Sequence, residues 1–173
     1  MIIKTKGFIL RYMKMSDLDK YYESVQDKLT KKGFMQVIKN KSEAKKELKY
    51  KISDYSRKKP FGIAFAIEIN GEFAGYVELH HLNQKYFEHK GEIGYCMHPN
   101  FRGKGIMSKA VRLVTNYAFK KYKLKRMTGT CRTFNKASAR VLEKAGYKLE
   151  GILKKNKYRN GRYLDDMVWA KIK

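Results

Sequence analysis

The sequence predicts a mixed α/β protein in which helices cover a mostly antiparallel sheet, and three observations support this class. Asn-Gly pairs at residues 70–71 and 160–161 stand between runs rich in β-branched and aromatic residues, which is typical of β-hairpins. Apolar residues recur at helical spacing over 105–122. Hydrophobic residues make up 43% of the 173 residues, enough for a packed core in one domain over 1–173.

The elements are expected in a definite order. A strand over 8–14 precedes a helix that begins near residue 17, with Ser16 as a candidate N-cap. A second helix is expected over 43–58, where Ser42 can cap the start and Pro60 stops the end. The remaining elements are strands over 61–69, 72–82 and 91–97, a helix over 105–122, a strand over 126–133, a helix over 136–145 capped by Asn135, and strands over 147–153 and 163–172. This order predicts a central sheet of about six or seven strands, flanked by about four helices.

The net charge of +24 is extreme and unevenly distributed. Residues 1–60 carry +10 and residues 102–173 carry +17, whereas residues 61–101 carry −3. Such an excess is typical of proteins that bind nucleic acid, a ribosomal surface or an anionic ligand. A lysine-rich composition with solvated helix faces explains it equally well. The sequence contains no helix-turn-helix signature, no RNP aromatics and no zinc spacing, so a nucleic-acid partner is not favoured.

The compartment is expected to be the cytoplasm. The first residues show no signal-peptide pattern, and no run of about 18 apolar residues predicts a membrane span. Cys96 and Cys131 lie in apolar, strand-like contexts, and without an export signal two reduced, buried thiols are expected rather than a disulfide.

A glycine-rich turn precedes the clearest helix. The turn connects the expected strand over 91–97 to that helix and consists of Arg102, Gly103, Lys104 and Gly105. Glycine lets a ligand approach the backbone closely, and the first N–H groups of a helix are free to bind an anion, above all phosphate. The P-loop pattern and the dinucleotide-binding pattern are both absent. Taken alone, a tight turn without a ligand is also consistent with these residues.

Four segments resemble the GNAT N-acetyltransferase superfamily, and within it the Rim-type ribosomal-protein acetyltransferases. They are "ILRYMKMSDLDKYY", "GEIGYCMHPNFRGKGIMSKAV", "NKASARVLEKAGYKLEGIL" and "RNGRYLDDMVWAKI". The acyl-CoA loop of the superfamily follows the pattern Arg/Gln-x-x-Gly-x-Gly/Ala. Arg102 and Gly105 match this pattern, and Met107 departs from its last position. The resemblance covers roughly residues 7–172.

The resemblance implies acetyl-CoA as co-substrate, no metal, and a sheet whose two central strands splay apart. The coenzyme pyrophosphate is then expected on the turn, and the pantetheine arm on the splayed strand and on the cap of the last helix. The residues implied in coenzyme binding are Tyr95, Cys96, Met97, Arg102, Gly103, Lys104, Gly105, Ile106, Met107, Ser108, Asn135 and Ser138.

The same resemblance suggests three catalytic groups. Acetyl transfer needs a base for the amine, a donor for the tetrahedral oxyanion and a proton for the leaving thiolate. The backbone N–H of Met97 is the expected oxyanion donor. Leu142 stands where many members have a tyrosine, so Ser138 is the expected partner of the thiolate, although a serine in the first turn of a helix can also be a plain capping residue.

Glu92 matches the strand glutamate that several superfamily enzymes use as a base, although a solvent-facing strand residue is the equal alternative. Lys157 occupies a position where Rim-type enzymes have a second glutamate, which puts a ribosomal-protein substrate in doubt. Glu78, His80 and His81 lie on the neighbouring predicted strand, and their spacing predicts no metal site.

The expected function is the acetylation of a primary amine, with a protein or peptide N-terminus as the leading acceptor and a ribosomal protein as one candidate. A polyamine or aminoglycoside acceptor is an alternative, although few acids are available to build a pocket for a small cation. A basic nucleic-acid- or ribosome-binding protein that kept the fold without the chemistry is another. The expected assembly is a monomer or a homodimer.

Overall fold

The computed structural model describes residues 3–34 and 37–173. Its helices are α1 (Leu18–Gln26), α2 (Lys28–Gly33), α3 (Lys41–Ser53), α4 (Ile106–Lys121) and α5 (Lys136–Lys144). Its strands are β1 (Ile3–Lys4), β2 (Ile9–Tyr12), β3 (Ile63–Ile69), β4 (Glu72–His80), β5 (Lys90–Met97), β6 (Arg126–Arg132), β7 (Lys148–Arg159) and β8 (Arg162–Ile172).

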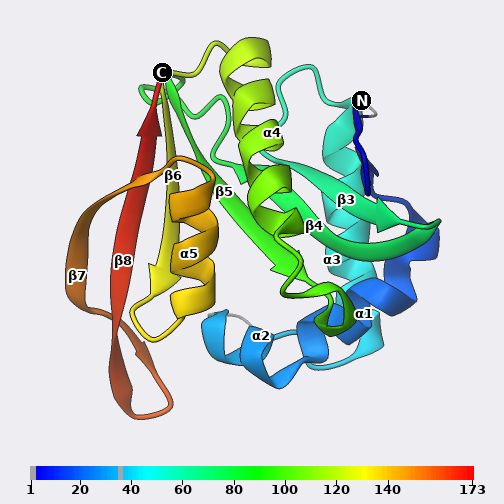
Figure 1. Ribbon diagram of the computed structural model, residues 1–173, viewed down its shortest axis with the longest axis horizontal. Coiled ribbons are helices and arrows are strands. Elements are labelled where there is room, and N and C mark those ends of the chain that lie inside the picture. The colour runs from blue at the N-terminus through cyan, green and yellow to red at the C-terminus, as the bar shows by residue number, and fades with distance from the viewer. Residues whose placement is uncertain (1–2, 35–36) are drawn as a thin grey trace.

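All eight strands join one sheet in the order β1-β2-β3-β4-β5-β6-β8-β7. Every neighbouring pair is antiparallel except β5 and β6, which run parallel at the centre. Their pairing covers three rungs, from Lys90 opposite Arg126 to Glu92 opposite Thr128. Beyond these rungs the two strands separate (Figure 1), so the expected splay between the central strands is confirmed.

Helices cover both faces of the sheet, as Figure 1 shows. One hydrophobic core packs α4 and α5 against the sheet and contains Val111, Val114 and Leu142. A second core on the opposite face packs α1 and α3 against β3 and β4, with Tyr21 and Leu48 fully buried. The alternation of side chains along β5 therefore sends Ile93 into the first core and Cys96 into the second.

The predicted class is correct, and its details need four corrections. Among the described residues the sheet has eight strands rather than six or seven, because the two-residue strand β1 is too short to produce a sequence pattern. The additional helix α2 brings the helices to five, and it begins where the Asp27 carboxylate accepts a hydrogen bond from the Thr30 N–H.

The first two predicted helices, which correspond to α1 and α3, also begin differently from the prediction. Asn40, rather than Ser42, caps α3, because its Oδ1 accepts the Glu43 N–H at 2.9 Å. Ser16 lies within a short 3₁₀ turn before α1, and Asp17 accepts the Lys14 N–H there instead. Within residues 3–34 and 37–173, the helices lack the length and apolar character needed to cross a membrane.

Candidate active site

The open end of the central sheet provides the frame of the site. The His98 N–H, just beyond the end of β5, donates to the Ala74 carbonyl of the neighbouring strand β4 at 2.9 Å. Successive N–H groups of a strand point to opposite sides, so the N–H groups of Met97 and Tyr95 point away from β4 and into the splay. The half of β5 expected to meet the pantetheine arm therefore presents backbone donors on its open side.

The glycine turn leads directly from β5 into α4. Gly103 and Gly105 have φ angles of +80° and +70°, a left-handed conformation that glycine adopts without strain. A Cβ placed at either residue would meet no heavy atom within 4 Å, so the space beside the turn is open. The first helical hydrogen bond runs from the Lys109 N–H to the Gly105 carbonyl. The N–H groups of residues 106–108 precede that bond and carry the positive end of the helix dipole.

The side chains of this first turn mostly serve packing. Met107 and Ser108 are buried, and Ile106 packs against the core. Lys104 is exposed, with its ammonium 5.9 Å from the centre of the Phe101 ring. An anion at this turn would therefore be held by backbone groups, with Lys104 as the mobile charge beside them.

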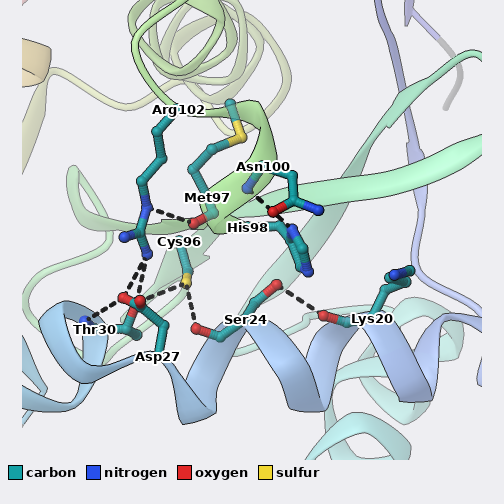
Figure 2. Close-up of polar contacts among 9 residues, drawn as sticks. All are labelled: Lys20, Ser24, Asp27, Thr30, Cys96, Met97, His98, Asn100 and Arg102. Carbon is teal, nitrogen blue, oxygen red and sulfur yellow. Dashed lines mark hydrogen bonds and ion pairs between the residues drawn. The ribbon is translucent and has the colours of Figure 1, made fainter.

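Arg102 ties the end of β5 to the junction of α1 and α2, as Figure 2 shows. Its Nε donates to the Met97 carbonyl at 3.1 Å, and its Nη2 donates to the Asp27 carboxylate at 2.7 Å and the Thr30 hydroxyl at 3.0 Å. Burial alone would raise the pKa of Asp27, but the bond from Arg102 lowers it overall. The guanidinium thus fixes the strand end, and direct contact of Arg102 with coenzyme A stays a prediction.

The thiol of Cys96 lies on the helix side of β5. Its Sγ is 3.8 Å from both the Ser24 carbonyl and the Thr30 hydroxyl (Figure 2). Burial raises the pKa of this thiol to about 12. The Cys96 N–H points toward β4, as that of His98 does, so the contact of Cys96 with coenzyme A stays a prediction.

Ser138 lies on the other side of the splay and is held by two residues. The Asn135 Oδ1 accepts the Ser138 N–H at 3.1 Å, which confirms Asn135 as the cap of α5. The phenol oxygen of Tyr95 lies 2.8 Å from the Ser138 Oγ and 3.0 Å from its carbonyl oxygen. Burial raises the pKa of Tyr95, so the phenol stays protonated. Leu142 is instead buried in the core, against the backbone of Gly129.

A cleft of 660 Å³ opens on the face of the sheet that carries α1 and α3. Glu92 lies in it at the point where β5 and β6 part, and its carboxylate accepts a hydrogen bond from the Thr130 hydroxyl at 3.2 Å. The His81 Nε2 lies 3.8 Å from the same carboxylate. Glu92 therefore faces a cavity large enough for an organic acceptor.

A buried charge network lies beside Glu92 in the same cleft. Glu78 forms ion pairs with Lys51 and, at 3.0 Å, with His80. Burial alone would raise the pKa of Glu78, but Lys51 and His80 lower it to about 2. Burial lowers and Glu78 raises the pKa of His80, and the net shift is upward. Glu78 is therefore held in its ion pairs with Lys51 and His80, whereas Glu92 is the less restrained carboxylate.

The structure adds residues that the sequence did not single out. Tyr95 was expected to contribute only its backbone groups, because no local sequence pattern shows that its phenol side chain reaches α5. Lys31 from α2 lines the acceptor cleft together with Lys157. Arg132 and Asp166 form a buried ion pair in its wall. In the described ranges, no three His, Cys, Asp or Glu side chains form a group suited to a metal ion.

Comparison with known proteins identifies the family. Residues 8–148 match the family described as the acetyltransferase (GNAT) domain. The chain belongs to the GNAT acetyltransferases. It is therefore an acyltransferase, and enzymes of this family take the acetyl group from acetyl-CoA, as expected from the sequence. The uncharacterized N-acetyltransferase YnaD of Bacillus subtilis is 29% identical over 171 residues, which are 98% of this chain and 96% of YnaD.

Solved structures share the fold over nearly the whole chain. A GNAT-family acetyltransferase from Bacillus anthracis is 25% identical with a TM-score of 0.86, covering 99% of this chain and 98% of that one. An acetyl transferase from Salmonella typhimurium, which modifies the N-terminal serine of ribosomal protein L7/L12, is 24% identical with a TM-score of 0.86 and 99% coverage of both chains. RimL, solved in complex with coenzyme A, is 24% identical with a TM-score of 0.87, covering 99% of this chain and 98% of RimL.

Proposed function

We propose that this GNAT acetyltransferase transfers the acetyl group of acetyl-CoA to the N-terminal amine of a peptide or protein. The observation that carries the proposal is the arrangement of the splay. Free strand donors and an open helix start lie at one end of it, and Glu92 lies in a 660 Å³ cleft at the other. This arrangement lets a thioester and an amine meet between β5 and β6.

Each group then has a defined role. Glu92 accepts a proton from the ammonium form of the acceptor, directly or through water. As the amine nitrogen bonds to the thioester carbon, the Met97 N–H stabilises the oxyanion. The C–S bond then breaks and the new amide nitrogen releases its extra proton to water, while the leaving sulfur accepts a hydrogen bond from Ser138 and takes up a proton from water. The glycine turn and residues 106–108 hold the coenzyme pyrophosphate.

A peptide acceptor is preferred over a small polycation because of the cleft wall. Lys31 and Lys157 line the cleft, and no carboxylate among the described residues pairs with either ammonium. A polyamine would place its second cation near these lysines. The solved Salmonella enzyme, which modifies an N-terminal serine, supports the same acceptor class. The cytoplasmic location remains a prediction.

The test is an acetyl-CoA consumption screen over peptides with free N-termini, polyamines and aminoglycosides. We expect turnover with peptides, and the Glu92→Gln variant should lower kcat/KM by roughly 10²–10⁴-fold and remove the acidic limb of the pH–rate profile. Glu88→Gln is the matched control, because Glu88 is exposed and lies outside the cleft. Turnover with polyamines alone would contradict the proposed acceptor, and an unchanged pH profile would assign the base to another group.

A further inference from the structure

The rim of the acceptor cleft consists of two basic segments. Residues 28–34, which form α2 and its C-cap Phe34, contain three lysines and no acid. Residues 151–162, which lead through β7 to the hairpin tip, contain five cations and no acid. One cation of each segment, Lys31 and Lys157, lines the cleft.

Arg159 joins these segments into one structure. Its Nη1 donates to the Lys31 carbonyl at 2.7 Å and also to the Phe34 carbonyl. These carbonyls belong to the end of α2. Because both acceptors are neutral, they take up hydrogen bonds from the guanidinium and leave its positive charge uncompensated. The β7–β8 hairpin therefore holds α2 beside the cleft and places a third positive charge next to Lys31.

The acids of the cleft are mostly paired. Asp166 pairs with the buried Arg132 and accepts a hydrogen bond from Asn156. Glu78 and Glu47 share the Lys51 ammonium. Glu92 lies at the splay with Thr130 and His81 as its polar neighbours. The cleft thus has a carboxylate where the amine reacts and, on α2 and β7, two cations that pair with no carboxylate of the described residues.

The register of the sheet gives the separation of the two ends. Thr130, which binds Glu92, is paired with Val168, and Lys157 is paired with Leu164. Four residues along β8 correspond to about 13 Å, and the two strand spacings from β6 to β7 add about 10 Å across the sheet, so the two backbones lie roughly 16 Å apart. An extended peptide covers this length with about five residues, and fewer suffice because the Lys157 side chain lines the same cleft as Glu92. An acceptor whose N-terminus lies at Glu92 would therefore bring its third to fifth residues to Lys157 and Lys31.

From this geometry we infer that the enzyme selects an acceptor with two features: a free N-terminal amine, and carboxylate side chains at about the third to fifth residues. Lys31 and Lys157 bind those carboxylates, and Arg159 positions α2 for this contact. The inference rests on the proposed function, because it assigns the specificity of the same cleft. The expected partner is an acidic peptide terminus rather than a polyamine or a nucleic acid.

The experiment uses three peptides that share their first two residues and carry three Asp, three Asn or three Lys residues at positions 3–5. We expect kcat/KM to fall in that order, by at least ~10-fold from Asp to Lys, mainly through KM, and the preference to weaken with added salt because charges are screened. The double variant Lys31→Glu/Lys157→Glu should reverse the order. Lys120→Glu/Lys121→Glu is the matched control, since these exposed lysines of α4 carry the same charge and lie outside the cleft.

The outcomes separate this inference from the proposed function. Acetylation of all three peptides at equal rates, or an order that the double variant leaves unchanged, would overturn the inference alone. Calorimetry of the Asp peptide with enzyme saturated with coenzyme A gives a readout that does not need turnover. Binding that depends on Lys31 and Lys157 without acetylation of any peptide would support the inference and contradict the proposed function. Absence of both binding and acetylation would overturn both.

Discussion

At the scale of single residues, the contact between Tyr95 and Ser138 decides how the leaving thiolate can be stabilised. The phenol can donate either to the Ser138 carbonyl or to its Oγ, since both lie within 3.0 Å. When the phenol donates to the Oγ, the serine hydroxyl is free to donate to a sulfur in the splay. When it donates to the carbonyl, the serine hydroxyl can donate back to the phenol. Tyr95 is thus a positioning residue for Ser138.

This arrangement predicts the behaviour of two variants. Ser138→Ala should reduce kcat by ~10- to 100-fold, and Tyr95→Phe by a smaller factor of about 3 to 10, because the serine loses its orientation but not its hydroxyl. The double variant should resemble Ser138→Ala, since the two groups act as one unit. The KM for acetyl-CoA should change little in all three.

Steady-state kinetics of the three variants gives the answer. Multiplying effects in the double variant would show that the two hydroxyl groups act independently. Loss of acetyl-CoA binding in Tyr95→Phe would instead assign the phenol to packing. Leu142→Tyr is not a useful rescue, because Leu142 is 1% exposed and packs against Gly129.

At the scale of elements, the turn into α4 matters more than any one side chain. Its two glycines need positive φ angles, and open space lies beside both. A side chain at Gly105 therefore costs backbone strain of about 1–2 kcal/mol and also fills the space that an anion would occupy. Strain alone would destabilise the fold without acting specifically on the coenzyme.

Gly105→Ala should weaken coenzyme A binding by at least ~10-fold, which is about 1.4 kcal/mol. Gly71→Ala is the matched control, because Gly71 also has a positive φ of +83° and open space around its Cβ, but lies in the β3–β4 hairpin. Isothermal calorimetry and thermal unfolding should show similar stability losses in the two variants and a binding loss in Gly105→Ala alone. Equal affinity in both would remove the turn from the coenzyme site.

At the scale of the whole molecule, a buried ion network links the α3 layer to the sheet. The Lys51 side chain from α3 is 9% exposed, and the Glu78 side chain from β4 is 12% exposed. Glu78 has its pKa lowered from 4.5 to about 2 in the fold. As the pH falls, the Glu78 carboxylate therefore takes up a proton in the unfolded chain at a higher pH than in the folded protein. The pair therefore contributes its full stability above about pH 4.5 and loses it as the pH falls toward 2.

Glu78→Gln should lower the free energy of unfolding by about 3 kcal/mol at pH 7, because Lys51 stays buried with a weaker partner. Urea denaturation at pH 7 and pH 2.5 should show that the difference in the free energy of unfolding between the variant and the wild type falls to less than half at the lower pH. Glu47→Gln is the comparison, since Glu47 contacts the same Lys51 at 3.3 Å but is 41% exposed, and it should cost less than about 1 kcal/mol. A difference that does not change with pH would show that Glu78 acts through packing.

The sequence by itself determined the local features of this protein. Hairpins at Asn70-Gly71 and Asn160-Gly161, the glycine turn before α4 and the Asn135 cap follow from the conformations that these residues prefer, so each could be predicted without long-range contacts. The same local signals, through the resemblance they carry, led to the GNAT family and the splayed sheet. The short elements β1 and α2 were missed because two to six residues contain too little periodicity.

Only the tertiary structure decided which side chains share a site. Arg102 appeared to be a free cation beside the turn, yet Asp27 and Thr30, about 75 positions earlier, bind it in the fold. Tyr95 meets Ser138 across 43 positions, and Arg159 meets Lys31 of α2 across 128. Such contacts depend on the order of strands in the sheet and on how helices pack against it. No window of local sequence contains that information, because the energy of each contact arises only after the distant segments have packed together.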